Sequence, residues 1–119
     1  STLMNLGALG TVGRIMPSNL IIVVWDNEKW AQTGYQPSHT AYGTDLEAVA
    51  KATGINKTKT VTNEEDLDLV FSQALEEPGP WYIVAKIEEQ EYLPVAPVEP
   101  EATLHRFRST FVTEQERIG

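Results

Sequence analysis

Two hydrophobic patterns follow one another at the start of the chain. Over residues 6–16 the apolar side chains recur at the spacing of one helical face, whereas residues 20–25 form a continuous apolar run rich in β-branched residues. Pro17 separates the two patterns and ends the first. The sequence therefore predicts a helix followed by a strand, and the continuous run is typical of a strand covered on both faces.

The same succession of patterns continues to residue 87. Helical spacing predicts one helix that opens at Thr44 and stops at Gly54, and a second that opens at Thr62 and extends to residue 75. Strands are predicted over 58–61 and 81–87. The order helix, strand, helix, strand, helix, strand favours right-handed crossovers. We therefore expect an α/β fold with an open parallel sheet and helices on both faces.

Both later helices begin with the spacing of a capping box. Thr44 and Glu47 stand three residues apart, as do Thr62 and Glu65. In a capping box each of the two side chains accepts a hydrogen bond from the other residue's backbone amide. The pattern predicts that the two threonines are the N-caps.

The first helix contains Gly7, Gly10 and Gly13. Each glycine costs about 1 kcal/mol relative to alanine inside a helix. Three of them predict a backbone pressed against a sheet, another helix or a ligand. They are not phosphate-binding glycines, since the chain has neither a phosphate-loop motif nor a dinucleotide fingerprint.

Residues 89–119 differ in character from the α/β domain predicted over residues 1–88. Pro94, Pro97 and Pro100 predict an extended arm, and Leu104, Phe107 and Phe111 then recur at helical spacing. One interpretation is an arm that docks through a short amphipathic helix on a partner subunit. The other is a frayed tail whose periodicity is accidental.

Composition limits the class of protein. A chain of 119 residues suits one domain, and 41% hydrophobic residues is ordinary for a globular protein. The formal charge of −8 argues against nucleic-acid binding. No apolar run approaches the roughly 20 residues of a membrane span, and no signal peptide is apparent. The absence of cysteine fits a reducing compartment, so we expect a cytoplasmic protein with no membrane association.

Candidate site residues follow the strand predicted over 20–25. Asp26 and Asn27 stand at its carboxyl end, the edge at which open α/β sheets bind ligands. The aperiodic segment 28–43 is long for a plain connection, and it contains His39, a residue type that often transfers protons near neutral pH. Two alternatives stay open: Asp-Asn is also common in turns, and a lone loop histidine is often only solvated.

Three stretches of the chain resemble a known family: residues 3–10, the pair Asp26-Asn27, and residues 32–46. They are similar to the thiamine diphosphate-binding domain of 2-oxoacid decarboxylases, in particular the beta subunit or C-terminal domain of sulfopyruvate and phosphonopyruvate decarboxylases. That family's cofactor motif is Gly-Asp-Gly, then helix and strand, then Asn-Asn. This chain contains no Gly-Asp-Gly, and Asp26-Asn27 stands where the closing pair is expected.

The resemblance implies roles for particular residues. Mg²⁺ bridges the cofactor diphosphate to hard oxygen ligands, so Asn27 is expected to supply a side-chain ligand and Lys29 a backbone carbonyl. Ser1 and Thr2 are expected near the diphosphate at the helix N-terminus. His39 is the candidate catalytic residue, and Asp26 is expected to be a hydrogen-bonding partner rather than a ligand.

The resemblance also implies a function: the diphosphate- and Mg²⁺-binding subunit of a decarboxylase that acts on a small anionic 2-oxoacid. In this chemistry the cofactor ylid attacks the substrate carbonyl, CO₂ leaves, and protonation releases an aldehyde. The activating glutamate belongs to a pyrimidine-binding domain, so an alpha-type partner subunit and a homo- or hetero-oligomer are expected. The alternatives are an acetolactate-synthase-like enzyme and a noncatalytic oligomeric α/β module.

A truncated chain would lack the strand that precedes the first helix in this family. The strand over 20–25 would then lose one neighbour. We accordingly expect an exposed apolar surface and self-association.

Overall fold

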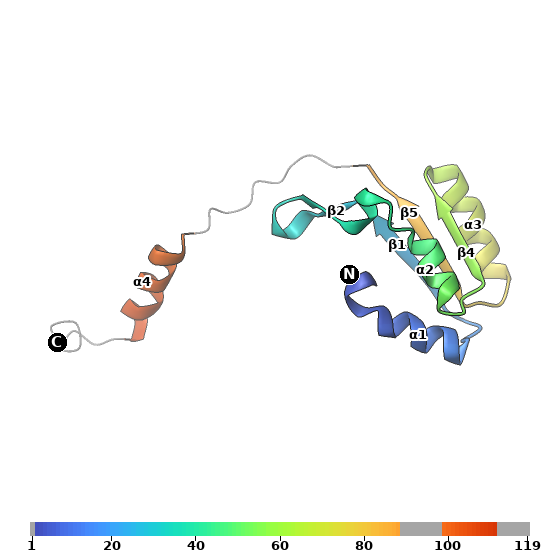
Figure 1. The fold of residues 1–119 in the computed structure, drawn as a ribbon, viewed down its shortest axis with the longest axis horizontal. Coiled ribbons are helices and arrows are strands. Elements are labelled where there is room, and N and C mark those ends of the chain that lie inside the picture. Colours follow the sequence, from blue (N-terminus) through green and yellow to red (C-terminus); the bar gives the residue numbers. More distant parts are fainter. Residues whose placement is uncertain (1, 89–98, 112–119) are drawn as a thin grey trace.

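The computed structural model describes residues 2–88 and 99–111. The helices and the strands of the main sheet follow the predicted order, and two short strands are added within the segment 28–43 (Figure 1). The regular elements are α1 (Leu6–Ile15), β1 (Ile21–Asp26), β2 (Lys29–Trp30), β3 (Gln36–Pro37), α2 (Leu46–Ala52), β4 (Lys57–Val61), α3 (Glu64–Glu76), β5 (Trp81–Lys86) and α4 (Pro100–Phe111). Short 3-10 helices cover Thr2–Asn5, Ala31–Thr33 and His39–Tyr42.

The main sheet has the strand order β1-β5-β4, and both strand pairs are parallel. Ile21 lies opposite Trp81 and Asp26 opposite Lys86, so β1 and β5 pair over their whole lengths. The central strand β5 is buried from Trp81 through Ala85. The predicted α/β class and parallel sheet are confirmed.

Alternate residues of β5 face two separate cores. Tyr82 and Val84 pack with residues of α1 and α2, among them Leu9 and Ala50. Trp81, Ile83 and Ala85 pack with Val61 and, from α3, Ala74. Helices therefore cover both faces of the sheet, as predicted (Figure 1).

Both predicted helix caps are wrong by one residue. Asp45 caps α2 by accepting from the Ala48 amide at 3.0 Å, and Asn63 caps α3 by accepting from the Asp66 amide at 2.8 Å. Aspartate and asparagine cap at least as well as threonine. The amide of Thr44 meanwhile donates to the carbonyl of His39, which closes the preceding 3-10 helix.

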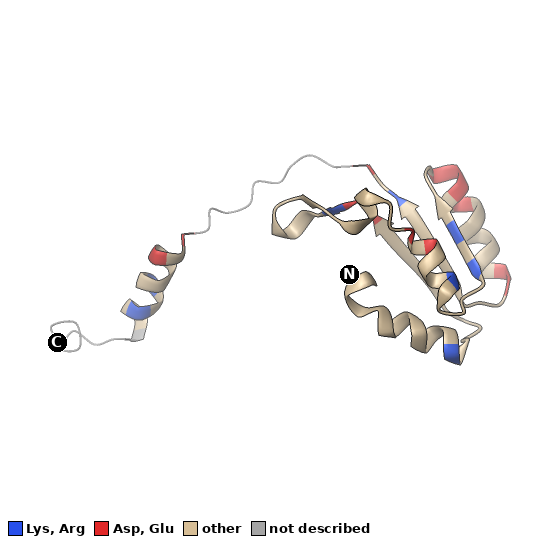
Figure 2. Cartoon of the chain, viewed as in Figure 1, with Lys and Arg blue, Asp and Glu red and all other residues tan. Residues whose placement is uncertain are grey.

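Two side chains at the start of these helices have other roles. Glu47 does not complete a capping box, because its carboxylate accepts from Thr60 at 2.8 Å and from Thr58 at 3.2 Å and so ties α2 to β4. The first turn of α3 holds three acidic residues, which the helix dipole favours. Figure 2 marks acidic positions of this helix in red.

The glycine prediction is confirmed at one position of three. A Cβ on Gly13 would lie 1.8 Å from the carbonyl oxygen of Thr53, so α1 crosses the end of α2 at backbone contact. A Cβ on Gly7 or Gly10 would have no neighbour within 4 Å.

The prediction that β1 is covered on both faces is wrong at its end. Trp25 is 60% exposed, because β1 is the outer strand of the described sheet and α3 packs on the other side of β5, towards β4. Trp25 is therefore not a core residue. Trp81, by contrast, is buried.

The helical periodicity of the tail corresponds to α4, on which Leu104 and Phe107 are exposed. Pro100 begins this helix rather than continuing an extended arm. The arm predicted around Pro94 and Pro97 lies outside the described residues. Among residues 2–88 and 99–111, no helix is long and apolar enough to cross a membrane.

Candidate functional site

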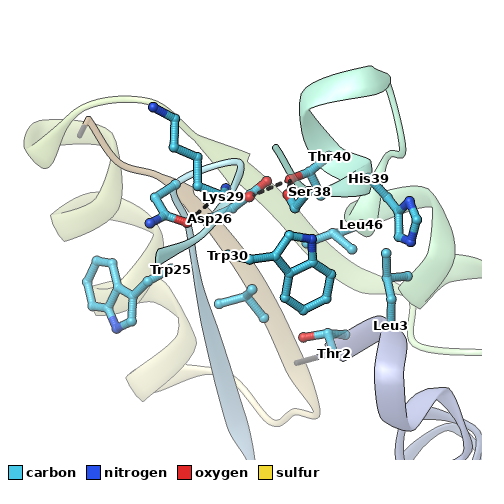
Figure 3. Close-up of a pocket in the computed structure, with 12 residues that line it drawn as sticks. Thr2, Leu3, Trp25, Asp26, Lys29, Trp30, Ser38, His39, Thr40 and Leu46 are labelled. Atoms are coloured by element: carbon cyan, nitrogen blue, oxygen red, sulfur yellow. Dashed lines mark hydrogen bonds between the residues drawn. The ribbon is translucent and has the colours of Figure 1, made fainter. Parts of the chain in front are cut away.

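A pocket of about 90 Å³ lies at the carboxyl end of β1. It is built where three segments meet: the residues before α1, the exit of β1, and the loop between β2 and α2 (Figure 3). Its lining consists of Thr2, Leu3, Val24, Trp25, Asp26, Asn27, Lys29, Trp30, Ser38, His39, Thr40 and Leu46. This is the sheet edge at which the sequence predicted a ligand site.

Four of the five predicted site residues line this one pocket: Thr2, Asn27, Lys29 and His39. Thr2 begins the 3-10 helix that leads into α1, Asn27 follows β1 directly, and His39 comes from the loop before α2. Ser1 lies outside the described residues. The structure thus brings together residues that are up to 37 positions apart (39 − 2) in the sequence.

Asn27 forms the turn that the sequence left open as an alternative. Its Oδ1 accepts from the amide of Lys29 at 3.1 Å. Glu28, between them, has a left-handed backbone with φ of 60°, a conformation that residues with a Cβ rarely adopt. A strained turn of this kind is frequent at ligand sites.

Asp26 is the hub of the pocket wall, and its carboxylate joins three segments. Oδ1 accepts from the hydroxyl of Thr40 at 2.7 Å (Figure 3). The same oxygen accepts from the amide of Glu28 at 3.0 Å, while Oδ2 accepts from Lys86 Nζ at 2.7 Å. Burial raises the pKa of Asp26, but the hydrogen bonds from Lys86, Thr40 and Glu28 outweigh it and leave the pKa below 3.8. Asp26 is therefore a charged hydrogen-bond acceptor whose two oxygens are both engaged, as expected of a partner rather than a ligand.

Lys86 ends the central strand and was not singled out from the sequence. Its ammonium donates to Asp26 and also to Glu28 Oε1 at 2.8 Å. Burial lowers the pKa of Lys86, but its bonds to the two carboxylates outweigh burial and raise the pKa above 10.5. No local pattern could have identified it, since 60 residues separate Lys86 from Asp26.

His39 and Trp30 form one wall of the pocket. Their rings meet edge to face, with centroids 6.4 Å apart and planes at 88°. His39 is exposed and Trp30 half-buried. Trp30 was not singled out from the sequence as a site residue, and it lines the pocket.

The oxygen atoms at the turn agree in type with part of a Mg²⁺ site. Asn27 offers an amide oxygen and Lys29 a backbone carbonyl, the hard donors that Mg²⁺ prefers. Among residues 2–88 and 99–111, no group of three or more His, Cys, Asp or Glu could hold a metal ion alone. Any Mg²⁺ held here would need the ligand's own oxygens and further donors.

Comparison with known proteins identifies the family of the chain. Residues 1–85 match the family described as thiamine pyrophosphate enzyme, C-terminal TPP binding domain. The chain is 42% identical over 88 residues to the sulfopyruvate decarboxylase subunit beta of Methanocaldococcus jannaschii. These aligned residues make up 72% of this chain and 45% of that protein. Against the same subunit of Methanococcus maripaludis, the identity is 39% over 108 residues, 90% of this chain and 57% of that protein.

A relative named for another activity is also similar. The phosphonopyruvate decarboxylase of Streptomyces viridochromogenes is 36% identical over 115 residues, which is 95% of this chain and 28% of that protein. The chain thus spans about half the length of the two beta subunits and less of the longer decarboxylase. Because the family model matches most of its residues, the chain belongs to the C-terminal TPP-binding domain family of thiamine pyrophosphate enzymes.

Proposed function

We propose that this chain is the diphosphate- and Mg²⁺-binding part of a thiamine diphosphate-dependent decarboxylase that acts on a small anionic 2-oxoacid of the sulfopyruvate or phosphonopyruvate type. Family membership and the names of the relatives support the enzyme class. One observation carries the location of the site: Thr2, Asn27, Lys29 and His39 line a single pocket at the carboxyl end of β1.

Asn27 and Lys29 would hold Mg²⁺ through the amide oxygen of the first and the carbonyl of the second. Thr2, and Ser1 before it, would lie beside the diphosphate, where the amide groups of a helix start favour an anion. When bound, thiamine diphosphate supplies the electron sink that decarboxylation needs. The chain's own contribution is to place the diphosphate end of the cofactor against the turn after β1.

His39 would accept or donate a proton at the solvent-exposed side of the pocket. Its imidazole is exposed and is held edge-on by Trp30, so it can exchange protons with solvent while keeping one orientation. Trp30 would at the same time shield this wall of the pocket from water.

We further propose that a pyrimidine-binding alpha-type subunit completes the enzyme. The name "subunit beta" of two relatives supports such a partner. A homo- or hetero-oligomer would cover exposed apolar side chains such as Trp25. Cytoplasmic localisation stays a prediction.

The test is isothermal titration of the chain with thiamine diphosphate, with and without Mg²⁺. Asn27→Ala removes the proposed ligand, and Asn56→Ala, at an exposed position before β4, is the matched control. We expect saturable, Mg²⁺-dependent binding by the wild-type and control chains and none by Asn27→Ala. The thermal unfolding temperature of the three proteins is measured as well. It distinguishes a variant that has lost only a metal ligand from one whose turn no longer forms.

Two results would contradict the proposal. Absence of binding at millimolar cofactor would refute it for this chain and favour a noncatalytic α/β module. Equal binding by Asn27→Ala would show that Asn27 is only a turn residue.

A further inference from the structure

We infer that Lys86 is a positioning residue for this site: it clamps the turn formed by residues 27–29 from the central strand. The inference rests on the proposed function for its meaning, because the clamped turn carries the proposed Mg²⁺ ligands. Lys86 itself does not line the pocket and, as a cation, cannot be a metal ligand.

The sheet register brings Lys86 to the turn. Lys86 lies directly opposite Asp26 in the parallel pair of β5 with β1, and the amide of Ile87 donates to the carbonyl of Asp26 at 3.1 Å. The side chain repeats this link, since Nζ donates to Asp26 Oδ2 at 2.7 Å. Backbone and side chain therefore fix the exit of β1 at the same point.

The second contact of Lys86 holds the strained residue of the turn. Glu28 has φ of 60° and is itself exposed, so packing does little to hold it. Its backbone amide donates to Asp26 Oδ1 and its side chain accepts from Lys86 Nζ. One ammonium group thus reaches Glu28 twice, directly and through Asp26.

The charge of Lys86 also stabilises the ionised carboxylate of Asp26, which accepts the other hydrogen bonds of the clamp. Asp26 is only 7% exposed, and a buried carboxylate without a cation is costly. Paired with Lys86, it stays charged and can accept from both Thr40 and Glu28 on its other oxygen. The loop before α2 is therefore held to the same clamp as the turn.

The test compares Lys86→Met with Lys86→Arg, which keeps the charge and the donors, and with Lys59→Met, a control at an exposed position of β4. Amide hydrogen exchange at Glu28 and Lys29 is measured by NMR without any ligand, because both amides donate to side chains of the turn. We expect at least a tenfold faster exchange in Lys86→Met, recovery in Lys86→Arg, and no change in Lys59→Met.

Mg²⁺-dependent affinity for thiamine diphosphate is then measured on the same proteins. Loss of a group that orients metal ligands typically weakens binding about 10- to 100-fold, and we expect that loss only in Lys86→Met. If Lys86→Met fails to fold, the double variant Lys86→Met with Asp26→Asn replaces it. The double variant removes the unpaired buried charge of residue 26 but still lacks the Lys86 contacts that hold the turn. We expect the same fast exchange in that double variant.

The outcomes separate the two proposals. Unchanged exchange in a folded Lys86→Met chain overturns the clamp, whatever the cofactor does. Fast exchange with unchanged cofactor affinity overturns its positioning role. If the wild-type chain binds no cofactor, the proposed function fails, and with it the positioning role, while the exchange data still decide whether Lys86 holds the turn.

Discussion

Gly13 offers the sharpest test of how the domain is packed. Replacing it by alanine would place a Cβ 1.8 Å from the carbonyl oxygen of Thr53 and 2.8 Å from its carbonyl carbon. Both are backbone atoms at the end of α2 and cannot rotate away. To restore even 3.0 Å to that oxygen, α1 must move by at least 1.2 Å (3.0 − 1.8).

Two opposing effects set the magnitude for Gly13→Ala. Alanine favours the helix by about 1 kcal/mol over glycine. Overpacking costs roughly 1–3 kcal/mol, and a displacement of α1 that pulls Leu9 and Val12 from the core belongs at the upper end. The clash should win, and we expect a net destabilisation of about 2 kcal/mol.

Gly10→Ala is the matched control on the same helix. A Cβ there has no neighbour within 4 Å, so only the helix propensity acts and the variant should gain about 1 kcal/mol. Urea denaturation followed by circular dichroism measures both. With a slope of roughly 2 kcal/mol per molar, the midpoint of Gly13→Ala should fall by about 1 M and that of Gly10→Ala should rise. A Gly13→Ala chain as stable as the wild type, or two variants that shift alike, would refute the packing of α1 on α2.

Three further predictions concern other elements. Asn63→Ala removes the acceptor that caps the Asp66 amide and should lower the free energy of unfolding by about 1 kcal/mol in urea denaturation. For Glu47, burial raises the pKa but hydrogen bonds, the strongest from Lys51, hold it below 4.5. Glu47→Gln should therefore cost about 1 kcal/mol above pH 4.5, and the difference from wild type should vanish as pH falls through the lowered pKa, checked by denaturation at about pH 7 and about pH 3. Trp25→Thr removes an exposed apolar side chain and should weaken self-association in sedimentation velocity, whereas an unchanged association constant would exclude this surface.

The main strands and their succession along the chain could be predicted because burial leaves a strong signal in sequence. The run from Trp81 to Ala85 is apolar on both faces, which only a central strand requires, and the structure buries all five residues. Helix starts were harder. Thr44 and Asp45 are neighbours whose side chains can both cap a helix. In the structure the amide of Thr44 donates to the carbonyl of His39, and Asp45 is the residue that caps α2.

The site was predictable only in part, for a related reason. Asn27 and Lys29 lie on one continuous turn next to a clear strand, so their position follows from local sequence. Trp30 lies in a segment without periodicity, where no pattern distinguishes a pocket wall from an interface. Lys86 belongs to the site only through strand pairing, which single-sequence patterns do not specify.

The pairing of β1 with β5 determines both the packing of the core and the geometry of the pocket. A slip of one residue between β1 and β5 would turn Tyr82 and Val84 to the opposite face, so the two cores fix the register. That register is also what sets Lys86 opposite Asp26. The geometry of the turn after β1 is therefore determined by buried side chains at the other end of the ladder as much as by its own residues. Core substitutions in β5 that loosen its pairing with β1 should accordingly change the geometry of the turn at the pocket before they unfold the domain.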